Sequence, residues 1–315
     1  MKNESSRVDR SGIPWTVAGT AFLALVVVLM WHFARETNPT NELASKASRV
    51  DIVGQMEVAL ASASEAEKSA VLAITDQDSQ TFADQARAAT AEVDQGRQEL
   101  GKLLATGGTK GEQDLLSRFA DAFANLQRID EEVLRLAVKN TNLKAYALAF
   151  GPAADLVTAL DAALSRVAAK RAAAPDAMKV LRLASDARIG LLHTQVLLAP
   201  HIAEESDAKM DQMEAAMTRE SAGVRNALDG LAALPGLNGD KDLATAGSAF
   251  ARHGELKAKI LALSRENTNV RSLALSLNQK RKAMTISLDA LNTLRQAILD
   301  EPIAGVTYGR PAHPR

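Results

Sequence analysis

Cysteine is absent from the sequence, and aromatic residues make up only 3% of it. Without cysteine the chain has no disulfide, no cysteine-ligated zinc or iron–sulfur site and no thiol nucleophile. Nine prolines and 18 glycines in 315 residues are few for an all-β or a disordered chain. The net charge of −1 argues against a nucleic-acid partner, because such proteins need a basic face. A helical, membrane-linked protein is the class that remains.

An uncharged segment lies near the N-terminus, at residues 13–33. At ~1.5 Å per residue it spans about 30 Å, which is the thickness of a bilayer core. Trp15 and Trp31 lie near its two ends, so we expect both to be membrane-interface anchors. A cleaved signal peptide is the alternative. The apolar run exceeds the ~7–15 residues of a signal core, however, and no A-x-A site follows it.

Basic residues flank this segment unevenly. Lys2, Arg7 and Arg10 precede it, whereas Arg35 alone follows within twelve positions, so the positive-inside rule predicts a cytoplasmic N-terminus. No second apolar run occurs downstream. We therefore expect a single-pass protein of the inner (cytoplasmic) membrane, with the lipid bilayer as a partner and a periplasmic, extracytoplasmic C-terminal domain.

The rest of the chain contains an internal repeat. The segment from Phe123 to Leu164 aligns without gaps with the segment from Phe250 to Leu291, and twelve of the pairs are identical. The offset is constant throughout, and the triplet Asn-Thr-Asn at 140–142 recurs at 267–269. The preceding helix matches as well, at an offset one position longer, through Arg97, Leu100 and Leu103. The sequence thus predicts a tandem duplication.

Hydrophobic spacing predicts long helices in both copies. Apolar residues recur at alternating steps of three and four through Asn140 and Asn267, which is a heptad seam. We expect breaks at 75–78, 105–111, 172–176, Pro200 and 234–240, with Thr109 and Glu112 forming a capping box. Each copy then has two helices of about 25–40 residues and one of about 60. Gly151-Pro152 is expected to kink the first long helix.

The predicted fold is all-α, with one N-terminal transmembrane helix followed by a duplicated, elongated antiparallel helical bundle. The expected domains are a cytoplasmic stub (1–12), the transmembrane helix (13–33), a first bundle repeat (34–172), a second bundle repeat (173–300) and a disordered tail (301–315). The sequence leaves open whether each repeat closes its own bundle or the two interleave.

Asn140 and Asn267 are the candidate site residues, because each places an amide on an apolar seam. A buried Asn in a coiled coil most often fixes register through hydrogen bonds. Two alternatives are that these residues line a small ligand-binding cavity, or that they are partly exposed without a role.

Other polar patterns in the sequence give weaker evidence for a functional site. His193 and His201 lie eight residues apart, a spacing that does not favour a shared metal, and the stripe of Met210, Met213 and Met217 is typical of core packing. No catalytic motif is present, so we predict a protein that is not an enzyme and has neither cofactor nor metal site.

The segments LAVKNTNLKA and LSRENTNVRSLALSLNQKRKAMT resemble the four-helix-bundle sensory domain of methyl-accepting chemotaxis receptors. The resemblance covers most of residues 35–300 and includes an anchor that runs into the first bundle helix. It implies an extracytoplasmic module that senses a small molecule or a partner protein, usually as a homodimer. No family ligand motif maps onto particular residues here.

The sequence departs from that family after residue 300, where a second span, a HAMP linker and a cytoplasmic signalling hairpin are expected. We therefore expect a membrane-anchored, sensor-like module that takes part in signal transduction through a membrane signalling partner. The alternative is a structural or scaffolding coiled-coil protein of the cell envelope.

Overall fold

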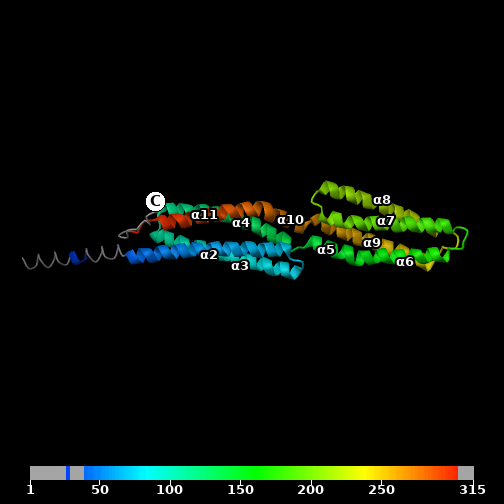
Figure 1. Ribbon diagram of the computed structural model, residues 1–315, viewed down its shortest axis with the longest axis horizontal. Helices are drawn as coiled ribbons and strands as arrows, with labels where there is room; N and C mark the ends of the chain where they lie inside the picture. Colours follow the sequence, from blue (N-terminus) through cyan, green and yellow to red (C-terminus); the bar gives the residue numbers. More distant parts are fainter. Residues whose placement is uncertain (1–25, 29–38, 304–315) are drawn as a thin grey trace, which may run out of the picture.

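The computed structural model describes residues 26–28 and 39–303, and these are helical with short connecting turns and no strand. The all-α part of the predicted fold is therefore confirmed. The stub, most of the proposed membrane segment, Trp15, Trp31 and the tail from residue 304 lie outside the described residues. Figure 1 shows the described helices arranged as one long rod.

The helices are bounded as follows: α2 Pro39–Leu72, α3 Asp76–Gly107, α4 Lys110–Ala137, α5 Thr141–Leu148, η1 Ala149–Ala153, α6 Ala154–Lys170, α7 Ala177–Ala203, α8 Asp207–Ala232, α9 Lys241–Glu266, α10 Thr268–Leu275, η2 Ser276–Lys280 and α11 Arg281–Asp300. The segments η1 and η2 are single π-helical turns, and they occupy equivalent positions in the two copies of the repeat.

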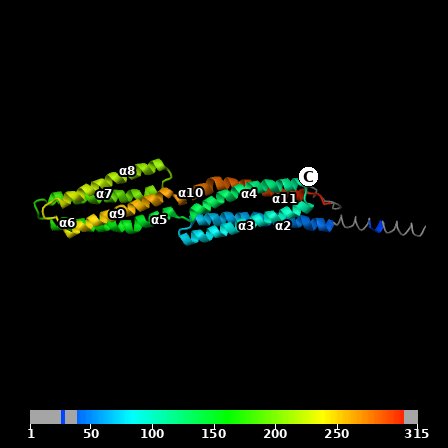
Figure 2. The same ribbon diagram turned by 180° about the vertical axis from the view of Figure 1, so that it is seen from behind.

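Two four-helix bundles stand end to end along the rod (Figures 1 and 2). The proximal bundle, which is nearer the N-terminus, consists of α2, α3, α4 and the α10–α11 segment. The distal bundle consists of α7, α8, α9 and the α5–α6 segment. Each bundle is therefore built from three helices of one copy and the last helix of the other. The two repeats interleave, which answers the question that the sequence left open.

Most of the expected helix boundaries are confirmed. Turns fall at residues 73–75, 108–109, 171–176 and 233–240. The capping box is formed as expected, because the Thr109 N–H donates to Glu112 Oε2 at 2.7 Å and the Glu112 N–H donates to Thr109 Oγ1 at 3.2 Å. The run from Lys110 to Lys170 is 61 residues long, which matches the expected length of the long helix.

The break predicted at Pro200 occurs a few residues later, at 204–206, because α7 continues through the proline to Ala203. A proline inside a helix removes one backbone hydrogen bond, here the bond to the carbonyl of Val196. Val196 lies on the exposed side of α7, and Pro200 falls in the last turn, where a lost bond costs little. The expected irregularity at Pro152 is a π turn, and the second copy forms the same turn without a proline.

The heptad seam is confirmed up to Asn140, since its apolar members are buried (Leu126, Ile129, Val133 and Leu136). Beyond the asparagines the seam prediction is right only at its far ends, where Leu164 and Leu291 are buried. The expected seam residues Phe150 and Leu277 are more than half exposed. Small buried residues instead recur at every fourth position: Ala137, Thr141, Ala145, Ala149 and Ala153 in one copy, and Ser264, Thr268, Ser272 and Ser276 in the other.

A spacing of four exceeds one turn of an α-helix, so such a stripe drifts by ~40° per step around a regular helix. The break at each asparagine and the wider π turn absorb this drift and keep the stripe facing inward. Small side chains allow α5 to pack closely on α9 and α10 to pack closely on α4. The stripe therefore lets the two long helices approach each other where they cross between bundles.

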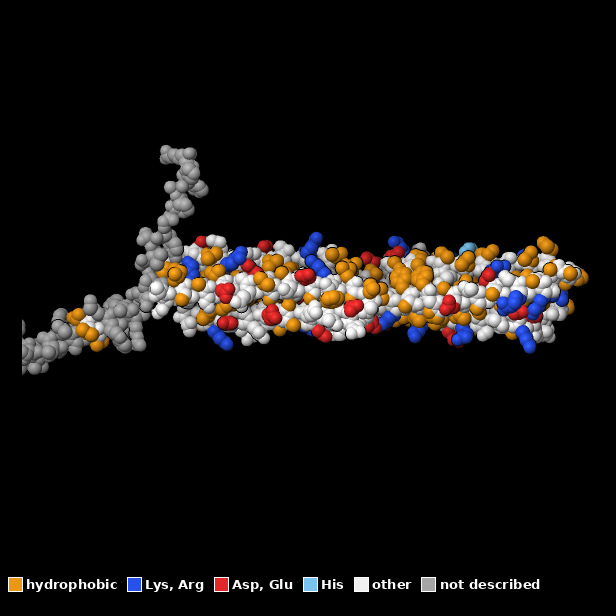
Figure 3. All heavy atoms as spheres, turned by 60° about the horizontal axis from the view of Figure 1, so that its bottom comes forward, with side chains coloured by type: hydrophobic (Ala, Val, Ile, Leu, Met, Phe, Trp, Pro, Cys, Tyr) orange, Lys and Arg blue, Asp and Glu red, His pale blue; other side chains and the backbone are white. Residues whose placement is uncertain are grey.

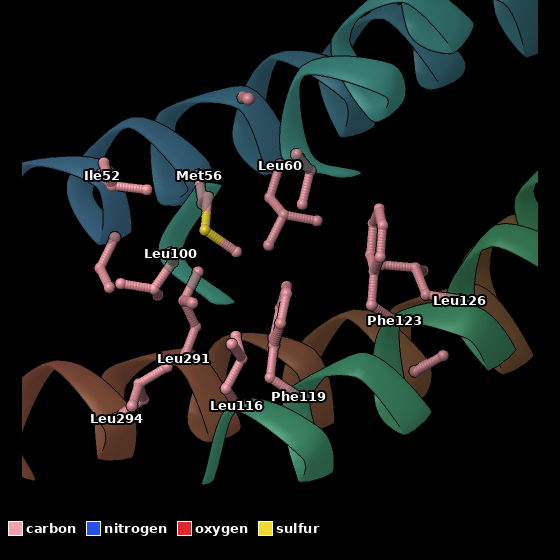
Figure 4. Packing of buried hydrophobic residues seen from close by; sticks show 14 of the residues in the cluster. Ile52, Met56, Leu60, Leu100, Leu116, Phe119, Phe123, Leu126, Leu291 and Leu294 are labelled. Carbon is pink, nitrogen blue, oxygen red and sulfur yellow. The ribbon is translucent and has the colours of Figure 1, made fainter. Parts of the chain in front are cut away.

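The core of the proximal bundle centres on Phe119 and Phe123, whose rings stack with centroids 5.5 Å apart (Figure 4). Met56 and Leu60 of α2 and Leu291 of α11 pack around them. Leu, Val and Ala form the distal core, including Leu160, Leu164, Leu191 and Leu231. Close-packed helices with small side chains explain why a rod of this length needs few aromatic residues.

Within the described residues, one helix is long and apolar enough to cross a membrane by length and composition, at Lys110–Lys170. This run is α4 to α6, and it contributes buried residues to both bundle cores. We therefore treat it as a bundle helix.

Candidate functional site: the polar junction between the bundles

Asn140 and Asn267 mark the points where the two long helices cross from one bundle to the other. Both adopt the left-handed conformation, with φ of 50° and 53°, and they are the only described non-glycine residues with positive φ. Asn tolerates this conformation better than other residues with a Cβ. Asn267 ends α9 and begins α10, and Asn140 begins α5 just after α4 ends at Ala137, so each predicted seam position is a helix junction.

The helices α5 and α10 begin side by side at this junction and run in opposite directions (Figure 1). Each caps the other. The Thr141 N–H donates to Thr268 Oγ1 at 3.2 Å, the Thr268 N–H donates to Thr141 Oγ1 at 3.1 Å, and the two hydroxyls lie 3.2 Å apart. First-turn N–H groups lack a partner within their own helix. Here the other copy supplies that partner.

Asn142 and Asn269 repeat this pattern one residue further on. The backbone N–H of each donates to the side-chain oxygen of the other at 3.2 Å. Their side-chain amides also cross: Asn142 donates to Asn267 Oδ1 at 2.7 Å, and Asn269 donates to Asn140 Oδ1 at 2.9 Å. The network has a local twofold symmetry that follows from the duplication.

The outer members of the network hold the loops that border the junction. Asn140 donates to Asp76 Oδ1 at 3.1 Å, at the start of α3. Asn267 donates to the Glu204 carbonyl at 2.8 Å, and Asn142 donates to the Ile202 carbonyl at 2.6 Å, both at the end of α7. A hydrogen bond from Lys144, assisted by Asn140, holds the pKa of Asp76 below its usual range. The polar junction, residues 140–142 and 267–269, thus ties both bundles together.

A charged cluster lies in the proximal bundle beside η2. The Lys280 ammonium donates to Glu67 Oε2 at 2.8 Å and to Ser64 Oγ at 2.9 Å, and Asp130 Oδ1 lies 3.7 Å away. The three charged side chains are almost completely buried. One oxygen of Glu67 and one of Asp130 have no hydrogen bond. Two carboxyl groups therefore face one ammonium group inside the bundle.

Burial raises the pKa of Asp130 to about 6, because desolvation disfavours the carboxylate. Lys280 opposes this shift, whereas Glu67 and the more distant Glu131 add to it. The buried cluster of Glu67, Asp130 and Lys280 consequently gains or loses a proton between mildly acidic and neutral pH.

The distal bundle carries a neutral cluster in the corresponding place, beside η1. Gln195 of α7, the repeat equivalent of Glu67 of α2, donates to the Ala149 carbonyl at 2.7 Å, and its oxygen lies 3.1 Å from His253 Nε2. Burial lowers the pKa of His253 to about 4, with a smaller contribution from the nearby charge of Lys257. The imidazole therefore stays neutral at physiological pH.

The two histidines singled out from the sequence have separate environments. His201 is fully buried, with Nδ1 at 2.8 Å from Ser264 Oγ and Nε2 at 2.9 Å from Glu214 Oε1. His193 is exposed, 3.5 Å from Glu220. Within the described part of the chain, no group of three or more His, Cys, Asp or Glu residues could hold a metal ion.

A second group of buried salt bridges lies at the end of the proximal bundle that is farthest from the junction. The buried Arg49 of α2 donates to both oxygens of Glu112 at 3.1 and 3.0 Å and to Glu301 at 2.8 Å. Lys46 donates to the Leu299 carbonyl at 2.7 Å. The first helix and the last helix of the described chain are thus joined at the base of the rod.

Sequence reasoning identified Asn140 and Asn267 but missed the partners that give them a role. The signal for Asn142, Thr141 and their equivalents was present, because the whole triplet is shared between the copies. Lys280 was missed because the heptad seam was used to predict the buried face, whereas Lys280 belongs to the stripe of every fourth residue that runs through Ser276. No known family model matches the chain, and no curated protein sequence matches it either.

Proposed function

We propose that this protein is a membrane-anchored, extracytoplasmic sensor-like module that takes part in signal transduction through a partner protein. The observation that carries the proposal is the exchange of long helices at the polar junction. The run from α9 to α11 starts in the distal bundle and ends at the base of the rod, where it meets α2. A change in the distal bundle therefore has a direct helical path to the anchor.

The irregular backbone supports this proposal. Left-handed residues and π turns are uncommon in helices and are concentrated at functional positions. Here both copies of the repeat have both features close to the junction. A protein that served only as a spacer has no need for buried ionisable groups beside such turns, since apolar residues of similar volume are often as stable.

One observation favours the alternative of a structural or scaffolding protein. The amides of Asn140 and Asn267 are engaged in short hydrogen bonds with the chain itself. A ligand that bound at these amides would have to displace those bonds. If the protein is a sensor, its ligand binds elsewhere on the rod.

Thermal unfolding of the full-length chain in lipid nanodiscs, measured against a panel of small metabolites, tests the proposal. A ligand at ~100 times its Kd should stabilise the fold by about 2.7 kcal/mol. The same ligand should change the amount of a membrane protein that co-purifies with the chain. Unfolding that no panel member shifts, together with a partner that binds equally under all conditions, would favour the scaffold.

A further inference from the structure

The helix α7 has two apolar faces, although only one of them is needed for the core. Val180, Ala184, Leu191 and Leu198 are buried in the distal bundle. On the outer side, five large apolar side chains are about half or more exposed: Met178 77%, Leu181 48%, Ile189 51%, Leu192 51% and Val196 63%. We call these five residues the α7 stripe.

The α7 stripe keeps to one side of the helix, where the polar Ser185 separates Met178 and Leu181 from Ile189, Leu192 and Val196. At ~100° per residue its members fall within an arc of about 80°, and they extend over ~27 Å along the helix. Phe150, which is 57% exposed, stacks on Tyr146, whose hydroxyl donates to the Ala199 carbonyl of α7. Hydrophobic side chains also gather on the distal bundle close to the junction in Figure 3.

Single exposed apolar residues are ordinary on protein surfaces, but several exposed on one face mark interaction sites. The proximal bundle offers a contrast. On α2, the exposed large hydrophobic residues Leu43, Val58 and Leu72 are each separated by several helical turns. The exposed large hydrophobic residues of α7 are therefore closer together than those of α2.

A groove of about 450 Å³ lies between α6 and α7, next to the stripe. Val157, Leu160, Ile189 and Leu192 form its apolar walls. Its two charged residues are Asp161 and Arg188, which form an ion pair with each other. A surface with one charge of each sign at its centre is complementary to a copy of itself related by a twofold axis.

We propose that the α7 stripe and the α6–α7 groove form the interface with a second copy of this chain. The proposal rests on the proposed membrane anchor, which makes the two rods parallel and brings each residue level with its counterpart. Ile189, Leu192 and Val196 of one copy then pack against the same residues of the other. Arg188 of each copy faces Asp161 of the other, so the ion pair becomes a ring of four alternating charges.

Single-cysteine cross-linking of the full-length chain in detergent tests this interface, because the native sequence has no cysteine to interfere. Leu192→Cys should oxidise to a covalent dimer of twice the 33.5 kDa chain mass. Val58→Cys, a control on α2 that is more exposed (67% against 51% for Leu192), should stay monomeric. Ser185→Cys should also form a cross-linked dimer. Adding Ile189→Glu to Ser185→Cys should abolish that cross-link and leave the circular dichroism spectrum unchanged.

Equal cross-linking of Leu192→Cys and Val58→Cys would overturn the interface, as would a monomeric mass in light scattering. A cross-link that survives Ile189→Glu would also overturn it. The proposed sensor function is tested separately, because a metabolite-induced shift in unfolding does not depend on cross-linking. A monomer that responds to a ligand would retain the function and lose the interface.

Discussion

The backbone N–H of Asn142 donates to the side-chain oxygen of Asn269 at 3.2 Å, and the backbone N–H of Asn269 donates to the side-chain oxygen of Asn142 at the same distance. The two residues are far apart in the sequence and belong to helices that enter different bundles. Each helix start is therefore completed by the other copy. A duplicated sequence has become one rod because the copies cap each other.

Replacement of Asn142 or Asn269 by Ala should lower the free energy of unfolding by about 2–4 kcal/mol, because several buried polar groups lose their partners. The double variant should lose less than the sum, by about 0.5–3 kcal/mol, since both substitutions break the same bonds. Urea unfolding of the four proteins measures this cycle. Asn278→Ala is the matched control, because Asn278 is exposed and bonds only within its own helix. Strictly additive losses would show that the two residues act independently.

The left-handed backbone at Asn140 gives a second prediction. Asn140→Ala loses the side-chain hydrogen bonds and also forces a Cβ-bearing residue that disfavours this conformation to adopt it. Asn140→Gly loses the same bonds but accepts positive φ freely. The Gly variant should therefore be more stable than the Ala variant by about 1–2 kcal/mol, the reverse of their order inside a regular helix. A more stable Ala variant would mean that the helix runs straight through residue 140.

The two buried clusters predict opposite dependences of stability on pH. The pKa of Asp130 is raised from 3.8 to about 6 on folding, so the folded state holds a proton that the unfolded state releases in this range. Its contribution to stability is therefore lost as pH rises from about 4 to 6. The pKa of His253 is lowered from 6.5 to about 4, so its contribution is lost as pH falls through the same range. Each effect has a slope of about 1.4 kcal/mol per pH unit.

Variants separate the two effects. Relative to the native chain, Asp130→Asn should gain stability as pH rises from 4 to 6, and His253→Gln should lose it, each by up to about 3 kcal/mol. Urea unfolding at half-unit pH steps measures both differences. Parallel pH profiles for a variant and the native chain would mean that the substituted group has the same pKa in the folded and unfolded states.

Substitution of Arg49 should lower the free energy of unfolding more than most substitutions at the base of the rod. Arg49→Met leaves the buried carboxylate of Glu112 without its cation and should cost about 3–5 kcal/mol. Arg87→Met removes an Arg–Glu pair of similar geometry with Glu131, but both side chains there are exposed. The exposed substitution should cost less than about 1 kcal/mol. Equal costs, measured by urea unfolding, would contradict the importance of burial.

Local patterns in the sequence were sufficient to predict the helices themselves. The capping box at Thr109, the turn at 171–176 and the heptad seam before Asn140 depend on neighbouring residues, and the structure confirms them. The sequence did not predict that both copies would share their irregular turns at equivalent positions. Pro152 suggested a special turn in one copy only, yet the second copy forms it without proline.

The exchange of helices could not be predicted in this way, because it depends on which distant helix covers each face. Small residues at a period of four carried the relevant signal, but Ala and Ser define a helix face weakly beside Leu and Ile. The pairing of Lys280 with Glu67 joins two distant parts of the chain, which no local pattern connects. The sequence singled out Asn140, but it did not predict the left-handed backbone conformation of this residue.

Coupling between the bundles is most directly measured by native-state hydrogen exchange of the full-length chain with a substitution in the distal core. Leu231→Ala removes a fully buried side chain far from the base and should cost about 2–5 kcal/mol. If the junction couples the bundles, the slowest amides of α2 and α11 should lose the same free energy of protection as those of α8. When Asn142→Ala and Asn269→Ala are added to Leu231→Ala, the loss should be confined to the distal bundle. Faster exchange in α8 alone, with α2 and α11 unchanged in the otherwise native chain, would contradict a rod that transmits a signal.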